Sequence, residues 1–136
     1  KQEGKYVRFR GVDSCLAEIE DVISKYKVKI LYFNDDCFTA RRDFIEEFCK
    51  RYPKLFKYPF DINARPETLN DDICRMLKEA GCRRISIGIE NGSEAFRREV
   101  LGRRQSNQII IKSNNLQIFK FPNQIIFKST NLHNKK

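Results

Sequence analysis

The chain has 136 residues, of which 40% are hydrophobic and 33% are charged, which fits one soluble globular domain. No apolar run approaches the roughly 18 residues that a membrane-spanning helix needs, and the first residues contain no apolar signal core. The cysteines form no CxxC or CxxxC pair; they are Cys15, Cys37, Cys49, Cys74 and Cys82. We therefore expect reduced, buried thiols in a cytoplasmic protein, with no metal site.

The formal net charge of +9 is unevenly distributed along the chain. Residues 1–104 hold all 18 acidic residues and 22 of the 27 Lys and Arg, so this part carries +4 and residues 105–136 carry +5. No basic-aromatic motif or recognition helix accompanies the charge. The pattern favours a solvated surface with an unusual tail over nucleic-acid binding.

The first half of the chain alternates helical and strand patterns. Apolar residues at helical spacing predict a helix over 12–26, and an uninterrupted apolar run predicts a buried parallel strand over 29–33. Thr39 can cap a second helix, which Tyr52-Pro53 should end.

The same alternation continues through residue 102. A strand is predicted over 58–63, followed by a helix that Asn70 or Thr68 caps and Gly81 stops. Residues 84–90 alternate with period two, which predicts a strand, and a further helix should span about 93–101. The order predicts an α/β fold with parallel strands over residues 1–104, either an incomplete (β/α) barrel or an open partial sheet.

Residues 105–136 have a different character. The segment 107–116 recurs as 123–132 with eight of ten positions identical, and the tail contains no acidic residue. Such biased repeats are not evidence of a folded domain. We expect a low-complexity, basic, disordered tail that is not native to the fold; a functional adhesive tail is the alternative.

Polar clusters follow each predicted strand. They are Asn34-Asp35-Asp36, Asn63-Ala64-Arg65-Pro66-Glu67 and Glu90-Asn91-Gly92-Ser93-Glu94. In parallel α/β folds, the carboxyl ends of the strands carry the functional site. We therefore expect the three clusters to converge on one face.

Several phrases together resemble the radical S-adenosylmethionine (SAM) superfamily, and most closely the subgroup with a cobalamin-binding domain. They are Tyr6-Val7-Arg8-Phe9-Arg10, Tyr32-Phe33-Asn34-Asp35-Asp36-Cys37-Phe38-Thr39, Ile62-Asn63-Ala64-Arg65-Pro66-Glu67, Ala80 through Glu94, and Leu101-Gly102-Arg103. The resemblance implies a partial (β/α)6 barrel that binds SAM, a [4Fe–4S] cluster and a small-molecule substrate, in a methyltransferase or cyclase assisted by cobalamin.

The resemblance also implies roles for individual residues. Asp35 and Asp36 match the position beside the methionine ammonium of SAM, and Arg65 could pair with its carboxylate. Glu90 and Ser93 match residues that face the ribose and methionine part. Purely structural roles remain open for all five: a strand end, a loop acid, a structural arginine and a helix cap. No catalytic residue is assigned.

The family's three-cysteine CxxxCxxC loop has no counterpart in this sequence, which also lacks an initiator Met. Cys37 alone cannot replace three cluster ligands. The sequence therefore predicts a fragment of a radical SAM enzyme that cannot cleave SAM by itself. The alternative is a non-catalytic α/β module that binds a nucleotide or a protein.

Overall fold

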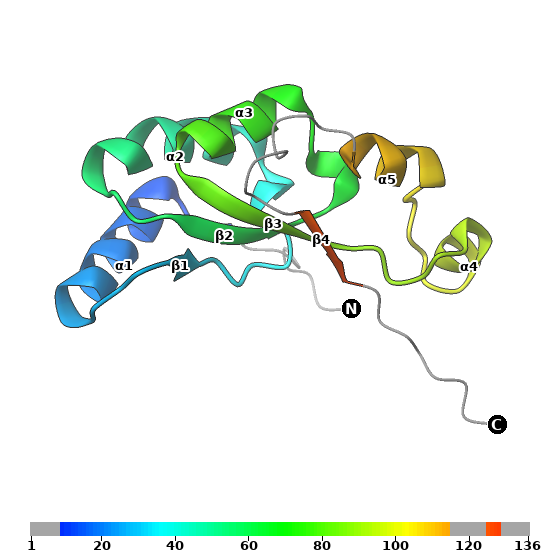
Figure 1. The fold of residues 1–136 in the computed structure, drawn as a ribbon, viewed down its shortest axis with the longest axis horizontal. Coiled ribbons are helices and arrows are strands. Elements are labelled where there is room, and N and C mark those ends of the chain that lie inside the picture. The colour runs from blue at the N-terminus through cyan, green and yellow to red at the C-terminus, as the bar shows by residue number, and fades with distance from the viewer. Residues whose placement is uncertain (1–8, 115–124, 129–136) are drawn as a thin grey trace, which may run out of the picture.

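The computed structural model describes residues 9–114 and 125–128, and its centre is a parallel β-sheet (Figure 1). The strands lie in the order β1-β2-β3-β4 and are all parallel: β1 (Leu31–Tyr32), β2 (Phe60–Ala64), β3 (Cys82–Gly88) and β4 (Ile125–Lys128). This confirms the predicted α/β class with parallel strands. The described sheet is open at β1 and at β4, which is consistent with a partial barrel.

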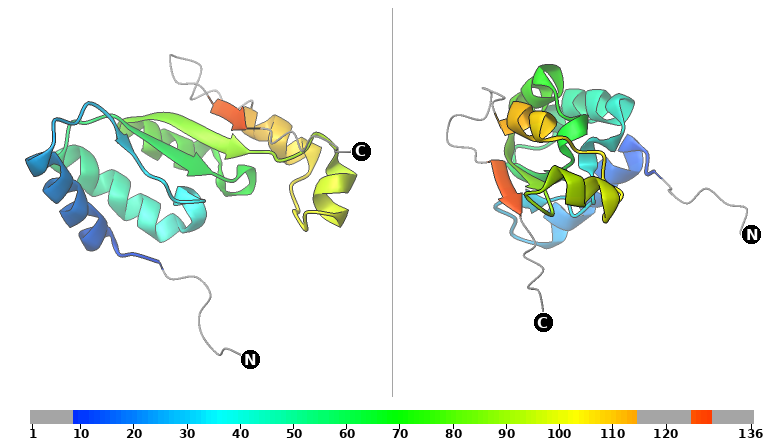
Figure 2. Two further views of the ribbon diagram at one scale, coloured as in Figure 1. Left: turned by 90° about the horizontal axis from the view of Figure 1, so that it is seen from below. Right: turned by 90° about the vertical axis from the view of Figure 1, so that its right-hand side faces the viewer.

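The three long helices lie on one face of this sheet (Figures 1 and 2). They are α1 (Val12–Lys25), α2 (Arg42–Leu55) and α3 (Asp71–Glu79). Two 3-10 turns follow β1 and β2, namely η1 (Phe38–Ala40) and η2 (Pro66–Thr68). The helices α4 (Glu94–Glu99) and α5 (Asn107–Asn114) lie toward the end of the sheet at which β3 finishes (Figure 1).

Period-two alternation on β2 and β3 separates an apolar face from a polar one. Phe60 and Ile62 of β2 are fully buried against the helices, whereas Asn63 is on the other face, where it is paired in register with Ser86 of β3. Each large apolar side chain buried in this way contributes roughly 1.5–3 kcal/mol. The small and polar face is the one that would form a barrel interior, as the pattern of 84–90 predicts.

An aromatic cluster fills the space between α2 and the sheet. Phe48 is fully buried and packs edge-on against Phe60, with ring centroids 5.7 Å apart. Tyr52 is also fully buried, and its hydroxyl donates to the Tyr58 carbonyl at 2.7 Å. This bond satisfies the only polar atom of the Tyr52 side chain, so the ring can remain in the core.

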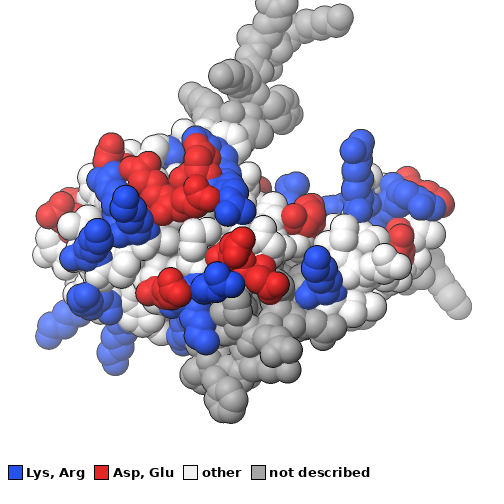
Figure 3. Space-filling model, turned by 90° about the horizontal axis from the view of Figure 1, so that it is seen from above, with Lys and Arg blue, Asp and Glu red and all other residues white. Residues whose placement is uncertain are grey.

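The outer surface of the helix layer carries interspersed acidic and basic side chains (Figure 3). Exposed ion pairs such as Arg42–Glu46 and Arg51–Glu47 link neighbouring turns of α2. Pairs of this kind add little stability. The high charge content is therefore explained in part by a solvated helix surface.

The third helix starts and stops where its sequence signals predict. Asn70 caps α3 by accepting a hydrogen bond from the Ile73 amide at 2.9 Å. Gly81 follows the C-cap residue Ala80 with φ of +100°. A positive φ is costly for residues other than glycine, so Gly81 provides the predicted helix stop.

The second helix differs from its prediction at both ends. Thr39 does not cap it but lies in η1, where its hydroxyl contacts that of Thr68 at 2.5 Å; the N-cap is Arg41. The helix also continues through Pro53 to Leu55, because a proline removes only one backbone donor and the Phe56 amide still bonds to the Tyr52 carbonyl at 2.8 Å.

The first strand is shorter and more exposed than predicted. A buried strand was expected over 29–33, but β1 comprises Leu31–Tyr32, and the side chains of Ile30 and Tyr32 are 41% and 46% exposed. Within the described residues β1 pairs with β2 alone. An edge strand of this kind lacks the second neighbour that would bury it.

The described parts of the tail do not match the expected disorder over 105–136. Residues 107–114 form α5, and residues 125–128 form β4, which pairs with β3 from Ile85↔Ile125 to Gly88↔Lys128. Runs of isoleucine suit a buried parallel strand, so the biased composition hid a further helix–strand unit. The rest of the tail lies outside the described residues.

No helix in the described part of the chain is long and apolar enough to cross a membrane.

Substituting Gly81 tests the helix stop. Gly81→Val should lower the free energy of unfolding by about 1–3 kcal/mol, because valine is strained at a positive φ. A Cβ atom there would meet only the Tyr58 carbonyl oxygen at 3.9 Å, so the cost is backbone strain rather than a clash. Chemical denaturation measures it, with Gly92→Val in open space as the control. Equal stability of the two variants would contradict this assignment.

Truncation tests whether β4 belongs to the sheet. A chain that ends at Asn114 should unfold at lower denaturant concentration, and its β3 amides should exchange faster with solvent, because β3 loses a hydrogen-bonded neighbour. A chain that ends at Lys128 keeps the strand and is the control. Unchanged β3 protection in the shorter chain would show that β4 does not pair with β3 in solution.

Candidate functional site

The segments that follow β1, β2 and β3 meet at the carboxyl end of the sheet. A cavity of about 220 Å³, here called the strand-end pocket, is lined by Asp36, Ala64, Arg65, Gly88, Glu90 and Arg103. Asp36 follows β1, Arg65 follows β2 and Glu90 follows β3. The three polar clusters therefore converge on one face, as their shared position after parallel strands predicts.

Three of the five predicted site residues line this pocket, and two do not. Asp36, Arg65 and Glu90 lie at its wall. Asp35 instead lines a second cavity of about 730 Å³ between α1 and the loop after β1. Ser93 is the N-cap of α4, and its hydroxyl accepts a hydrogen bond from the Phe96 amide at 3.3 Å.

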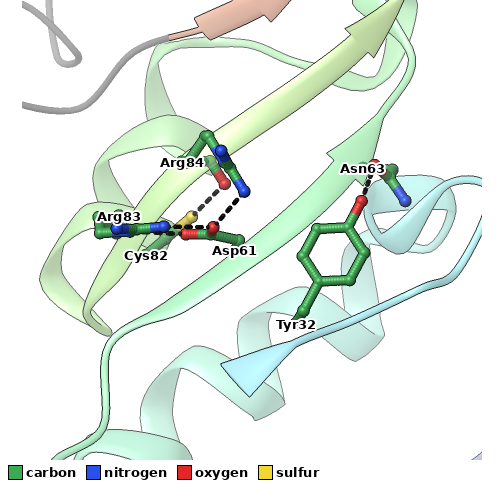
Figure 4. Close-up of polar contacts among 6 residues, drawn as sticks. All are labelled: Tyr32, Asp61, Asn63, Cys82, Arg83 and Arg84. Atoms are coloured by element: carbon green, nitrogen blue, oxygen red, sulfur yellow. Dashed lines mark hydrogen bonds and ion pairs between the residues drawn. The ribbon is translucent and has the colours of Figure 1, made fainter. Parts of the chain in front are cut away.

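The loop that carries the two aspartates is fixed by Asn63 on the polar face of β2. The Asn63 side chain donates to the Asp35 carbonyl at 3.0 Å and accepts a hydrogen bond from the Tyr32 hydroxyl at 2.8 Å. Figure 4 shows the Tyr32–Asn63 contact across the two strands. This amide couples the end of β1 to β2, so the position of Asp36 depends on the register of the sheet.

The pocket contains two carboxylates and two guanidinium groups. Asp36 and Glu90 supply the negative charges, and Arg65 and Arg103 supply the positive ones. An Arg103 Nη2 atom lies 3.5 Å from Glu90 Oε1, and both side chains are about one third exposed. The pocket is therefore electrically neutral but bipolar, which suits a ligand that carries both an ammonium and a carboxylate group.

Glu90 reaches the pocket through an unusual backbone conformation. Its φ is +68°, and the Asn91 amide donates to the Ile89 carbonyl at 2.8 Å across it, which closes a tight turn. A Cβ atom on Gly88 would lie 2.8 Å from Glu90 Oε1. Glycine at position 88 therefore makes room for the carboxylate that folds back over the end of β3.

Arg103 is the pocket residue that sequence reasoning missed. It belongs to the phrase Leu101-Gly102-Arg103 but lies nine positions beyond Glu94, the end of the last strand-end cluster. Gly102 has φ of +63°, which turns the chain after α4 and returns Arg103 to the pocket. The available signal was a charged residue directly after a helix-stopping glycine.

A different charge cluster lies at the opposite end of the sheet. Asp61, near the start of β2, is 2% exposed and accepts hydrogen bonds from Arg83 at 3.0 and 2.6 Å, and Arg84 Nη2 lies 2.7 Å from its Oδ2 (Figure 4). The carboxylate is saturated by two guanidinium groups. We assign this cluster to fold stability rather than to ligand binding.

The five cysteines do not provide a ligand set for an iron–sulfur cluster. Among the described residues, no group of three or more Cys, His, Asp or Glu is placed to hold a metal ion. Burial raises the pKa of the Cys15 thiol to about 11 and the pKa values of the Cys49 and Cys74 thiols to about 12. Metal ligation requires thiolates, so these side chains behave as small core residues.

Thiol reactivity tests this assignment in a Cys37→Ser chain. At pH 8 the remaining thiols should react far more slowly in the folded protein than in urea, because raising the Cys15 pKa from 9.0 to about 11 alone lowers its thiolate fraction about a hundredfold. Since the folded pKa values are raised, stability should be full below pH 9 and fall as pH rises toward 11–12. Equal rates in the folded and unfolded chains would contradict buried thiols.

Comparison with known proteins agrees with the resemblance seen in the sequence. Residues 1–116 match the family model described as the radical SAM superfamily. The chain is also 27% identical over 93 residues to an uncharacterized methyltransferase of Pyrococcus horikoshii. That match covers 68% of this chain and 20% of the relative, so the chain spans about one fifth of the relative's length.

Proposed function

Because this chain belongs to the radical SAM superfamily, we propose that its strand-end pocket holds the methionine end of SAM. The observation that carries the proposal is that Asp36, Glu90, Arg65 and Arg103 all line one cavity. Its volume of about 220 Å³ is below the roughly 300–1,000 Å³ of whole small-molecule sites. The pocket is thus sized for one polar end of a ligand.

The pocket residues have complementary tasks in this proposal. Asp36 accepts hydrogen bonds from the ammonium group, and Arg65 donates to the carboxylate as a planar fork. Glu90 accepts hydrogen bonds from the ammonium group or the ribose hydroxyls. Asp35 adds negative potential beside the ammonium site. The Ser93 hydroxyl still has a proton to donate while it caps α4, so its two roles are compatible.

The cysteines do not fit the second cofactor that the family implies. When bound, a [4Fe–4S] cluster supplies the electron that cleaves SAM, and it needs three thiolate ligands in this family. The described cysteines do not come together in such a set. All five cysteines of the sequence lie among the described residues, so this chain has no further thiolate to offer, and we expect it to be inactive alone.

The reaction of the whole protein is a further part of the proposal. The name of the Pyrococcus relative supports methyl transfer, and the family resemblance supports a small-molecule substrate. The resemblance to the cobalamin-binding subgroup supports cobalamin assistance, with cyclisation as the second reaction class. A cytoplasmic location is supported by the five free cysteines.

Binding of labelled SAM to this chain tests the pocket directly. Asp36→Asn, Arg65→Gln and Glu90→Gln should each weaken binding roughly 10- to 150-fold, the usual effect of losing a charge-assisted hydrogen bond. Saturation-transfer NMR detects the ligand even where affinity is low. L-Methionine should compete with SAM in the wild-type chain, because the pocket binds the amino-acid end.

Two exposed residues on α3 provide matched controls. Asp72 and Arg75 form an ion pair outside the pocket, so Asp72→Asn and Arg75→Gln should leave SAM binding unchanged. Pocket variants that bind SAM like the wild type would refute the proposal. Competition by adenosine but not by L-methionine would favour the nucleotide-binding module instead.

A further inference from the structure

Arg97 is fully buried, and removing its positive charge from water costs folding free energy. It lies on α4, has no exposed surface, and donates four hydrogen bonds. Its Nε and Nη2 atoms each donate to the Gln105 carbonyl at 3.2 Å, Nη2 also donates to Asn107 Oδ1 at 2.6 Å, and Nη1 donates to the Asn91 carbonyl at 2.5 Å. One guanidinium group therefore holds two segments, the turn at Asn91 and the stretch from Gln105 to Asn107.

None of these acceptors is a carboxylate. Within the described residues Arg97 forms no ion pair; its guanidinium donates to two backbone carbonyls and one side-chain amide, and the Glu94 carboxylate bonds to the Asn107 amide rather than to Arg97. A buried charge that is paired only with dipoles costs stability relative to an apolar side chain of similar length. Filling space does not explain an arginine here, so its hydrogen bonds need a separate explanation.

The hydrogen bond from Arg97 to the Asn91 carbonyl stabilises the turn that places the Glu90 side chain. The Asn91 carbonyl is bound to Arg97, and the Asn91 amide is bound to the Ile89 carbonyl. The residue between Ile89 and Asn91 is Glu90, whose φ of +68° is unfavourable for a glutamate. By holding the Asn91 carbonyl, Arg97 therefore stabilises the left-handed turn at Glu90, and this turn places the Glu90 carboxylate over Gly88.

The other bonds fix the segment that brings Arg103 to the same pocket. The Arg103 amide donates to the Arg97 carbonyl at 2.8 Å, and the Gln105 carbonyl accepts from the Arg97 guanidinium. The Arg97 backbone thus holds Arg103 at its own amide, and the Arg97 guanidinium holds the chain two residues further on, at Gln105. Its guanidinium faces Glu90 across the pocket at 3.5 Å.

We propose that Arg97 is a positioning residue that sets the distance between Glu90 and Arg103, and so the charge separation that the pocket offers to the methionine end of SAM. The inference rests on the proposed function for its ligand. Its structural part, that Arg97 holds the Glu90 turn, can be measured without any ligand.

The ligand-free test uses Arg97→Met, which keeps an unbranched side chain but removes the donors. The Asn91 amide should exchange with solvent at least about tenfold faster than in the wild type, while global stability is unchanged or raised. Arg98→Met is the matched control, because Arg98 is adjacent and 67% exposed. If the Asn91 amide keeps its protection in Arg97→Met, the proposal is overturned.

The ligand test asks whether Arg97 acts through Glu90. Arg97→Met and Glu90→Gln should each weaken SAM binding, and the double variant should lose less than the sum of the two losses, because both substitutions act on the Glu90–Arg103 pair. Arg65→Gln should instead add its full effect to Arg97→Met. Additive losses for Arg97 and Glu90 would refute the coupling. Unchanged SAM binding by Glu90→Gln would refute the proposed function, and the Asn91 exchange would still decide the role of Arg97.

The wild-type chain provides a measurement that does not depend on a variant's folding. The Arg97 Hε proton should give a resolved NMR signal that exchanges slowly at neutral pH, because its nitrogen is buried and donates to the Gln105 carbonyl. Fast exchange of this proton would contradict the proposal even if Arg97→Met fails to fold.

Discussion

The arrangement of the molecule depends on the period-two alternation of β2 and β3. Phe60, Ile62 and Ile85 pack against the helix layer, so the residues between them must face the other way. That second face is small or polar, and it ends at the strand-end pocket. A one-residue slip in register would exchange the two faces. The aromatic packing of Phe48 on Phe60 therefore fixes the position of the site as well as the core.

The two charged clusters of the sheet differ in how far their charges are satisfied. Asp61 is buried and saturated by two arginines, so nothing further can bind to it without breaking an ion pair. In the strand-end pocket, Glu90 and Arg103 are about one third exposed and 3.5 Å apart. Such charges can still take a ligand's groups as partners. The left-handed Glu90 and the buried Arg97 cost stability near this pocket, as functional sites often do.

The sequence predicted those features that depend on local signals or on topology. The Asn70 cap and the Gly81 stop are local, and the meeting of Asp36 with Glu90 follows from parallel strands alone. The position of Arg103 could not be predicted, because it depends on the tertiary hydrogen bonds of Arg97. A strand at β1 was predicted, but not its shortness and exposure, because pairing partners decide burial. The β4 strand was not predicted, because the repeated, biased composition concealed its strand propensity.

The charges that line the pocket balance one another without a bound cluster, so the proposed binding of a ligand and the proposed chemistry rest on different groups. Two carboxylates and two guanidinium groups can hold a zwitterion without any further charge from a cluster. No cysteine lines the pocket, and burial raises the pKa values of the Cys49 and Cys74 thiols to about 12, so these two carry no charge near neutral pH. The proposed recognition of the amino-acid end therefore depends on the ends of three neighbouring strands and on the loop after α4 that carries Arg103. The described residues contain no group of three or more Cys, His, Asp or Glu placed to hold a metal ion, so the pocket residues serve the binding part of the proposal alone.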